Sequence, residues 1–81
     1  MIQVLFFGQL KDQVKMSSVK VEETATSVGE LKKTLGVMHP QWQQYLSKDS
    51  ILVAVNQTIG NDQTVLNDGD EVAFFPPVTG G

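Results

Sequence analysis

The chain has 81 residues, a formal net charge of −3 and no cysteine. Its length fits one small domain with a marginal core, and the lack of cysteine excludes disulfides, thiolate catalysis and zinc–thiolate sites. All six basic residues are lysines and they are scattered, which disfavours nucleic-acid binding. The sequence shows no apolar run of bilayer length and no signal peptide, so we expect a cytoplasmic protein without membrane contact.

The first third of the chain predicts an antiparallel pair of strands. Residues 2–7 alternate as a strand, with Ile2, Val4 and Phe6 on one face and Gln3, Leu5 and Phe7 on the other. Residues 8–18 are polar and predict a loop that can hold a short helical turn at residues 11–14. Alternation at residues 19–22 predicts the second, half-buried strand.

One helix is strongly indicated after this pair. Ser27-Val-Gly-Glu30 has the form of a capping box, with Ser27 as the N-cap and Glu30 at the third helical position. Val28, Leu31 and Leu35 then share one helical face, and Gly36 is expected to end the helix as its C′ residue.

A short second helix is predicted within residues 37–48. Pro40 suits its first turn, and the helical spacing of Trp42, Tyr45 and Leu46 indicates that this segment covers one end of the core. His39 is the only histidine, so a histidine-based metal site or catalytic dyad has no second member. We expect it at the surface or at a helix start.

The last third predicts three more strands. Residues 51–55 suit a central strand, Asn56-Gln57 a tight turn, and residues 58–59 a returning segment. Residues 64–66 predict a brief extended piece before the Asn67-Asp-Gly-Asp70 turn, and residues 72–75 the final strand. With a right-handed crossover, this order fits an α+β fold of the β-grasp (ubiquitin-like) type, although the pattern does not select it uniquely. We expect a mixed sheet of about five strands in a domain of residues 1–75.

Residues 76–81 form a C-terminal tail of unusual composition. Pro76 and Pro77 stop the sheet, and no charged side chain follows Glu71. Fully extended, the tail reaches roughly 20 Å and ends in Gly80-Gly81, the slimmest end a polypeptide can have. A frayed terminus is the simpler interpretation; the alternative is a tail that enters the narrow active site of another protein.

Two surface features accompany the tail. Leu5, Phe7, Ala73 and Phe75 put apolar groups on the sheet face away from the helix, and Phe7 and Phe75 lie close together if the first and last strands are neighbours. We interpret this face as a partner surface; the alternative is that loops cover it. The acids Asp68, Asp70 and Glu71 are interpreted first as a solvated turn and second as a patch that steers the tail to a basic partner.

The residues from Val55-Asn-Gln-Thr58, and from Asn67 through Glu71-Val-Ala-Phe-Phe-Pro-Pro-Val-Thr-Gly-Gly81, closely resemble the small subunit of molybdopterin synthase, as does Ile2-Gln-Val-Leu-Phe-Phe-Gly8. The resemblance implies a sulfur carrier with no active site or permanent cofactor of its own. The Gly81 carboxylate would be joined to AMP and then converted to a thiocarboxylate. Its sulfur would attack the cyclic pyranopterin precursor of the molybdenum cofactor.

The resemblance also implies roles for single residues and partners. Gly81 carries the acyl group and the sulfur, and Gly80 gives it clearance. Partner contacts fall on Phe7, Ile59, Phe75, Pro76, Pro77, Val78 and Thr79. The implied partners are a large subunit that supplies the catalytic lysines in a 2+2 heterotetramer, an adenylating enzyme related to ubiquitin-activating enzymes, and a sulfur donor protein.

Three alternatives remain open from sequence. They are a related sulfur carrier for thiamin or tRNA thiolation, a ubiquitin-like modifier joined to lysines through Gly81, and an interaction module whose tail is only a peptide ligand.

Overall fold

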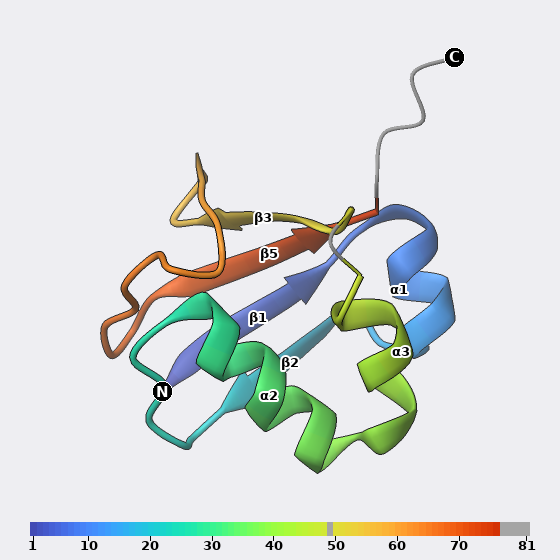
Figure 1. The fold of residues 1–81 in the computed structure, drawn as a ribbon, viewed down its shortest axis with the longest axis horizontal. Coiled ribbons are helices and arrows are strands. Elements are labelled where there is room, and N and C mark those ends of the chain that lie inside the picture. The colour runs from blue at the N-terminus through green and yellow to red at the C-terminus, as the bar shows by residue number, and fades with distance from the viewer. Residues whose placement is uncertain (49, 77–81) are drawn as a thin grey trace.

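The computed structural model describes residues 1–48 and 50–76, which fold into a mixed five-stranded sheet with its helices packed beside it (Figure 1). The strands are β1 (Ile2–Phe6), β2 (Ser18–Val21), β3 (Leu52–Val55), β4 (Thr58–Ile59) and β5 (Glu71–Phe75). Their order is β2-β1-β5-β3-β4, with β1 and β5 parallel and every other pair antiparallel. This confirms the predicted β-grasp fold. The predicted tail beyond Pro76 lies outside the described residues.

The main helix, α2 (Val28–Met38), begins as predicted and ends later. The N–H of Glu30 donates to the hydroxyl oxygen of Ser27 at 3.2 Å, so Ser27 is the N-cap. The Glu30 carboxylate accepts a hydrogen bond from the Thr26 hydroxyl at 2.6 Å. The prediction that Gly36 ends the helix is wrong, because the helix runs to Met38. Pro40 disfavours helical backbone at the residue before it, and His39 accordingly leaves the helical region.

The short helical turn predicted at residues 11–14 is present, and the prediction of a loop is wrong for residues 8–10, since a helix covers the whole segment 8–14. This helix, α1 (Gly8–Val14), buries Leu10 and Val14, which are one helical turn apart. Lys15 ends this helix in the left-handed conformation, with φ at 60°. With only two apolar positions among polar neighbours, this helix depends on the core that it contacts, and its pattern is weak when the sequence is read alone.

The second predicted helix is present as a 3-10 turn, η1 (Pro40–Trp42), followed by α3 (Gln43–Leu46). Trp42 is fully buried, its indole N–H donates to the carbonyl oxygen of Val14 at 3.2 Å, and its ring meets Phe6 edge-on. The segment therefore covers one end of the core, as expected. His39 is half-buried at the start of η1 and stacks on Trp42 with ring centroids 3.8 Å apart.

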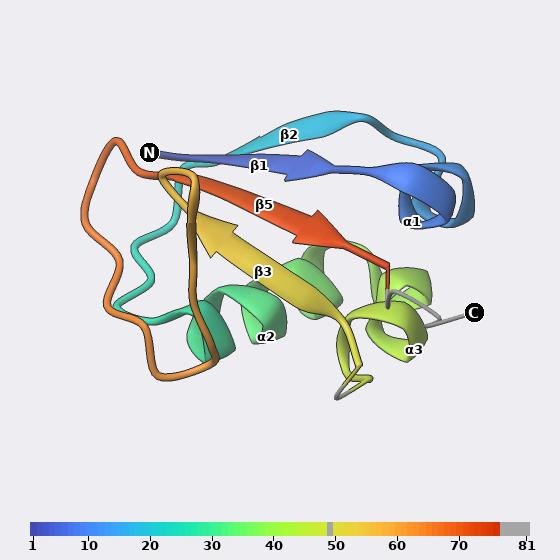
Figure 2. The ribbon, with the colours of Figure 1, turned by 90° about the horizontal axis from the view of Figure 1, so that it is seen from above.

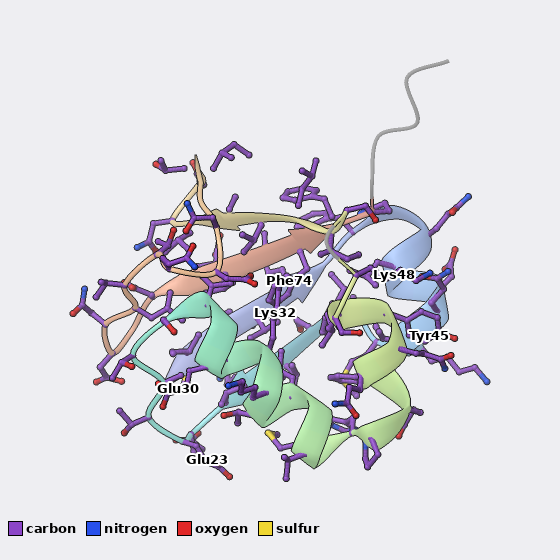
Figure 3. The ribbon with its side chains drawn as sticks, viewed as in Figure 1. Glu23, Glu30, Lys32, Tyr45, Lys48 and Phe74 are labelled. Atoms are coloured by element: carbon purple, nitrogen blue, oxygen red, sulfur yellow. The ribbon has the colours of Figure 1, made fainter. Side chains whose placement is uncertain are left out.

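The core lies between the sheet and α2, with α3 packed beside α2 (Figure 2). The side chains that point from the sheet toward α2 form what we call the inner face. Phe74, labelled in Figure 3, is one of them and is fully buried against Phe6. The inner face consists of Ile2, Val4, Phe6, Val19, Val21, Val53, Val55, Val72 and Phe74.

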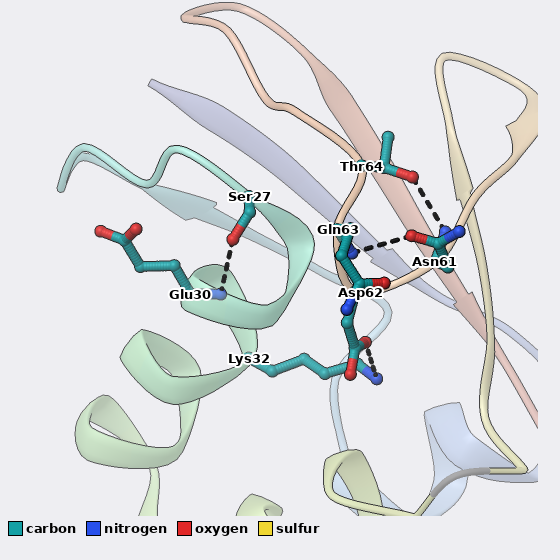
Figure 4. A network of polar contacts seen from close by, with 7 residues as sticks. All are labelled: Ser27, Glu30, Lys32, Asn61, Asp62, Gln63 and Thr64. Carbon is teal, nitrogen blue, oxygen red and sulfur yellow. Dashed lines mark hydrogen bonds and ion pairs between the residues drawn. The ribbon is translucent and has the colours of Figure 1, made fainter.

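The loop between β4 and β5 is attached to the first turn of α2 (Figure 4). The backbone N–H groups of Val28 and Gly29 donate to the carbonyl oxygens of Thr64 and Asp62 at 3.1 and 2.9 Å. Lys32 also pairs with the Asp62 carboxylate at 2.8 Å. The backbone bonds satisfy helix N–H groups that would otherwise lack partners, and together with the ion pair they hold the β4–β5 loop against α2. The predicted extended piece at residues 64–66 forms only an isolated bridge from Val65 to Ser27.

Candidate docking face and root of the tail

Phe7 and Phe75 form an aromatic pair on the sheet face opposite α2. Their rings stack with centroids 4.9 Å apart and planes inclined by 10°. The pairing of β1 with β5 brings them together, and the N–H of Phe7 extends it by donating to the carbonyl oxygen of Phe74 at 3.1 Å. Phe7 is 42% exposed and Phe75 is half-buried. The predicted proximity of these two residues is confirmed.

Strand register extends this pair into a continuous apolar surface. Leu5 lies opposite Ala73, Ala73 opposite Ala54, and Ala54 opposite Ile59, so these four side chains form one row across the sheet. Leu52 lies opposite Phe75 in the next row. We call this surface the outer face; it consists of Leu5, Phe7, Leu52, Ala54, Ile59, Ala73 and Phe75.

The outer face is open to solvent where its side chains are large. Ile59 is 71% exposed and Leu52 is 40% exposed. Ala54 and Ala73 are buried only because larger neighbours flank them in the row. Sequence reasoning missed Leu52 and Ala54, because residues 51–55 were interpreted as one apolar run. Because successive side chains of a strand point to opposite faces, the alternation within that run would have placed both residues on the outer face.

On the same side of the sheet as the outer face, the side chains become polar toward the start of β5. There Lys20, Gln3 and Glu71 lie side by side in one row across β2, β1 and β5. The apolar part is therefore concentrated at the other end of the sheet, where β5 ends and the chain continues into the tail. A partner that receives the tail would meet this apolar part first.

The acids near the sheet lie at the opposite end of β5 from the tail. Glu71 begins the strand and Asp70 directly precedes it, whereas Phe75 ends it (Figure 1). A role in steering the tail is therefore not supported, and the interpretation as a solvated turn is confirmed. The turn is well bonded: Asp68 pairs with the amino terminus, and Gly69 adopts the positive φ of 89° that favours glycine.

The Asp70 carboxylate links the β3–β4 turn to the turn at residues 67–70. The Asn56 side-chain amide donates to one carboxylate oxygen at 3.0 Å, and the backbone N–H of Asn67 donates to the other at 2.7 Å. The Asn56 bond first and the Asn67 bond second hold the pKa of Asp70 below its usual value. This site is structural: it ties the β3–β4 turn to the start of β5.

The root of the tail is packed against the start of α1. A Cβ atom added to Gly8, whose φ is +61°, would lie 2.9 Å from Cγ of Pro76, so only glycine permits this contact without a shift. A shallow cavity beside Pro76 is lined by Gln9, Tyr45 and Lys48, the last two labelled in Figure 3.

The remaining predicted tail residues, Pro77, Val78, Thr79, Gly80 and Gly81, lie outside the described residues, and their roles stay predictions. Phe7 and Phe75 lie together at the end of β5, with Pro76 next. Ile59 lies across the sheet on β4. Three of the seven predicted contact residues, Phe7, Ile59 and Phe75, therefore share the outer face, and Pro76 directly follows Phe75.

Two further observations concern the described part of the chain only. In residues 1–48 and 50–76, no helix combines the length and apolar character needed to cross a membrane. Within the same ranges, no three or more histidine or acidic side chains gather closely enough to hold a metal ion.

A β-grasp domain with a bare apolar sheet face, continued by a di-glycine tail, defines the class of small ubiquitin-like carriers and modifiers. Residues 4–81 match the sequence profile of the ThiS family, and the chain belongs to that family. It is 42% identical to the molybdopterin synthase sulfur carrier subunit of Escherichia coli (strain K12), over the full length of both chains. It is 36% identical to the protein of the same name from Haemophilus influenzae, also over the full length of both.

Solved structures show the same fold. SAMP1 from Haloferax volcanii superposes with a TM-score of 0.84 at 26% identity, covering 99% of this chain and 98% of that one. A protein–protein complex of subunits 1 and 2 of the molybdopterin-converting factor from Helicobacter pylori contains a chain that matches with a TM-score of 0.66 at 27% identity. That match covers 99% of this chain and 97% of the other.

Proposed function

We propose that this protein is the sulfur carrier subunit of a molybdopterin synthase. The observation that carries the proposal is the end-to-end match to relatives of that name, at 42% identity with no part of either chain left over. The outer face supports it, because its apolar part lies where β5 leads into the tail. The fold would dock on a partner through this face while the tail delivers Gly81 to the partner's active site.

The chemistry proposed for Gly81 follows from the low reactivity of a carboxylate. ATP and an adenylating enzyme join the Gly81 carboxylate to AMP with release of pyrophosphate, which creates a good leaving group. A sulfur donor then replaces AMP and leaves a thiocarboxylate. The thiocarboxylate sulfur attacks the cyclic pyranopterin precursor, displaces an oxygen substituent and forms a thioester with it. Water then hydrolyses the thioester, which leaves the sulfur on the precursor and returns the Gly81 carboxylate. Two such transfers supply the dithiolene sulfurs that bind molybdenum. AMP and sulfur are thus transient adducts of Gly81 rather than bound cofactors.

The proposed division of labour gives this chain no catalytic side chain. The second subunit of the synthase would supply the catalytic residues, in a 2+2 heterotetramer. Sulfur carried on the C-terminal carboxylate requires no side-chain thiol from this protein, which fits a chain without cysteine. The adenylating enzyme and the sulfur donor protein complete the set of proposed partners, and the cytoplasm is the proposed location.

The direct test is a mass measurement after reconstitution. The protein is incubated with its adenylating enzyme, ATP and a sulfur donor, and the intact mass is recorded. We expect a gain equal to one exchange of oxygen for sulfur, located by fragmentation at Gly81. A protein that gains no such mass, with an adenylating enzyme shown to be active on its own carrier, would contradict the proposal.

A variant lacking Gly81 is the matched control for this test. We expect no sulfur gain and no synthase activity, with a thermal unfolding midpoint close to that of the full chain, because the proposed domain of residues 1–75 does not include Gly81. A large drop in the midpoint would instead show that the tail is part of the folded structure.

A second candidate function is protein modification. It is favoured by the fold match to SAMP1 of Haloferax volcanii, since a second solved structure with the same fold is that of the small archaeal modifier protein 1 of this organism. In that case the activated Gly81 would form isopeptide bonds with lysines of other proteins. A ladder of conjugates, with no thiocarboxylate detected, would favour the modifier over the sulfur carrier.

A further inference from the structure

The turn between β3 and β4 contains a residue that the fold itself does not account for. Two residues, Asn56 and Gln57, connect the paired positions Val55 and Thr58, with φ values of 50° and 71°. Two successive positive φ values are typical of the type I′ hairpin turn, whose second position favours glycine. Gln57 occupies that position with a full side chain, which is destabilising relative to glycine.

The other non-glycine residues with positive φ in residues 1–48 and 50–76 have structural reasons for it. Lys15 is the C-cap of α1, and its N–H donates to the carbonyl oxygen of Lys11. Asn56 uses its side chain twice: its amide donates to Asp70, and its carbonyl oxygen accepts from the N–H of Glu71 at 3.0 Å. Asparagine also tolerates this conformation better than glutamine does.

Gln57 has no comparable reason. Its side chain is exposed and makes no hydrogen bond to any residue in the described ranges. The chain thus retains an unfavourable backbone conformation for a side chain that the folded domain does not use. Strained residues of this kind occur at functional sites, where the benefit lies outside the fold.

The position of Gln57 indicates what would use it. Ile59, two residues further along, is 71% exposed and completes the row that begins at Leu5 on the outer face. The turn lies at the end of the sheet where β5 begins, with Gln57 two residues before Ile59 at the β4 corner of the outer face. A carboxamide can donate and accept hydrogen bonds at once, which suits a polar group at the rim of an apolar interface.

We infer that Gln57 is a partner-contact residue, and that its carboxamide bonds to a peptide group of the second synthase subunit at the rim of the interface centred on the outer face. This inference rests on the proposed function, because it takes that subunit as the partner. It adds a polar anchor, rigidly held by the turn, to an interface whose other proposed contacts are apolar.

Two variants separate the side chain from the backbone. Gln57→Ala removes the carboxamide and keeps a residue with a Cβ in the left-handed conformation. Gln57→Gly removes both the carboxamide and the strain. We expect each variant to bind the purified second subunit about tenfold more weakly in calorimetric titration. We also expect Gln57→Gly to unfold about 2–5 °C higher than the wild type, and Gln57→Ala to unfold near the wild-type temperature.

Each outcome of the titrations decides the inference. If the wild type binds the second subunit and both variants bind it with the same affinity, the role of Gln57 is overturned and the proposed function stands. Failure of the wild type itself to bind the second subunit would count against the proposed function, and the inference would fall with it. An unfolding temperature for Gln57→Gly at or below the wild type would show that the turn is not strained, which removes the basis of the inference.

Discussion

The two faces of one sheet differ in what their apolar side chains contact. On the inner face, Phe74 has no exposed surface and packs against Phe6 beneath α2. On the outer face, Phe75, the next residue, stacks on the exposed Phe7 and is only half-buried. Neighbouring residues of the same type are thus directed to two different environments.

This difference separates stability from recognition. The inner face gains its free energy when the chain folds, because folding removes it from water. The outer face keeps large side chains in water and gains that free energy only when a partner covers it. Changes on the inner face should therefore alter unfolding, and changes on the outer face should alter binding.

The largest expected effect comes from truncating the inner phenylalanine. Phe74→Ala should lower the free energy of unfolding by about 3–5 kcal/mol, through lost burial and a cavity in the core. Phe75→Ala should lower it by only about 1 kcal/mol, mainly through the lost stacking on Phe7. Urea denaturation of both variants measures the contrast. Similar losses for the two variants would mean that the outer face also belongs to the folding core.

A charge on the outer face tests recognition. Phe75→Glu should weaken binding to the second synthase subunit by about 100-fold, since a carboxylate would have to lose its water in an apolar interface. Val65→Glu is the control, because Val65 is 67% exposed but lies on the loop beside α2. Unchanged affinity of Phe75→Glu would remove the outer face as the docking surface. An equal loss in both variants would point to a general effect of charge.

The smallest expected effect concerns the polar end of the sheet. The depressed pKa of Asp70 means that its charged form stabilises the fold above the usual pKa of 3.8 and that this contribution is lost as the pH falls through the lower folded value. Asp70→Asn should therefore unfold about 1–3 °C below the wild type at pH 7, and the difference should shrink below about pH 4.

The control for this measurement is Asp12→Asn. Asp12 is exposed on α1 and has no side-chain hydrogen bond within the described ranges, so the substitution should leave the unfolding temperature nearly unchanged at both pH values. If Asp70→Asn lowered the unfolding temperature by the same amount at both pH values, the hydrogen bonds of Asp70 would matter for stability and its charge would not.

Local patterns predicted most of the elements and failed where tertiary contacts dominate. The N-cap at Ser27, the turn at Asn56-Gln57 and the alternation of both faces were visible because each depends on near neighbours. Only the second half of helix α1 was predicted, as a short turn at residues 11–14, since the stability of the helix comes from inserting Leu10 and Val14 into the core. The end of α2 was misplaced because Gly36 suggested a stop, whereas Pro40 determines where the helix ends.

The candidate site divides in the same way. The di-glycine tail, the lack of cysteine and the family were readable from the chain. The strained turn was not, since the cost at Gln57 becomes visible only with its φ value and with the finding that its side chain has no hydrogen-bond partner among the residues that the structure describes.

The sequence alone determined that this small acidic domain has two apolar sheet faces and an uncharged tail, because alternation and composition are local properties. Only the tertiary structure decided which side chains meet. Parallel pairing of the first and last strands brings Phe7 beside Phe75 at the root of the tail and puts the acids at the far end. Strand register is set by packing of the whole core, which no local segment contains.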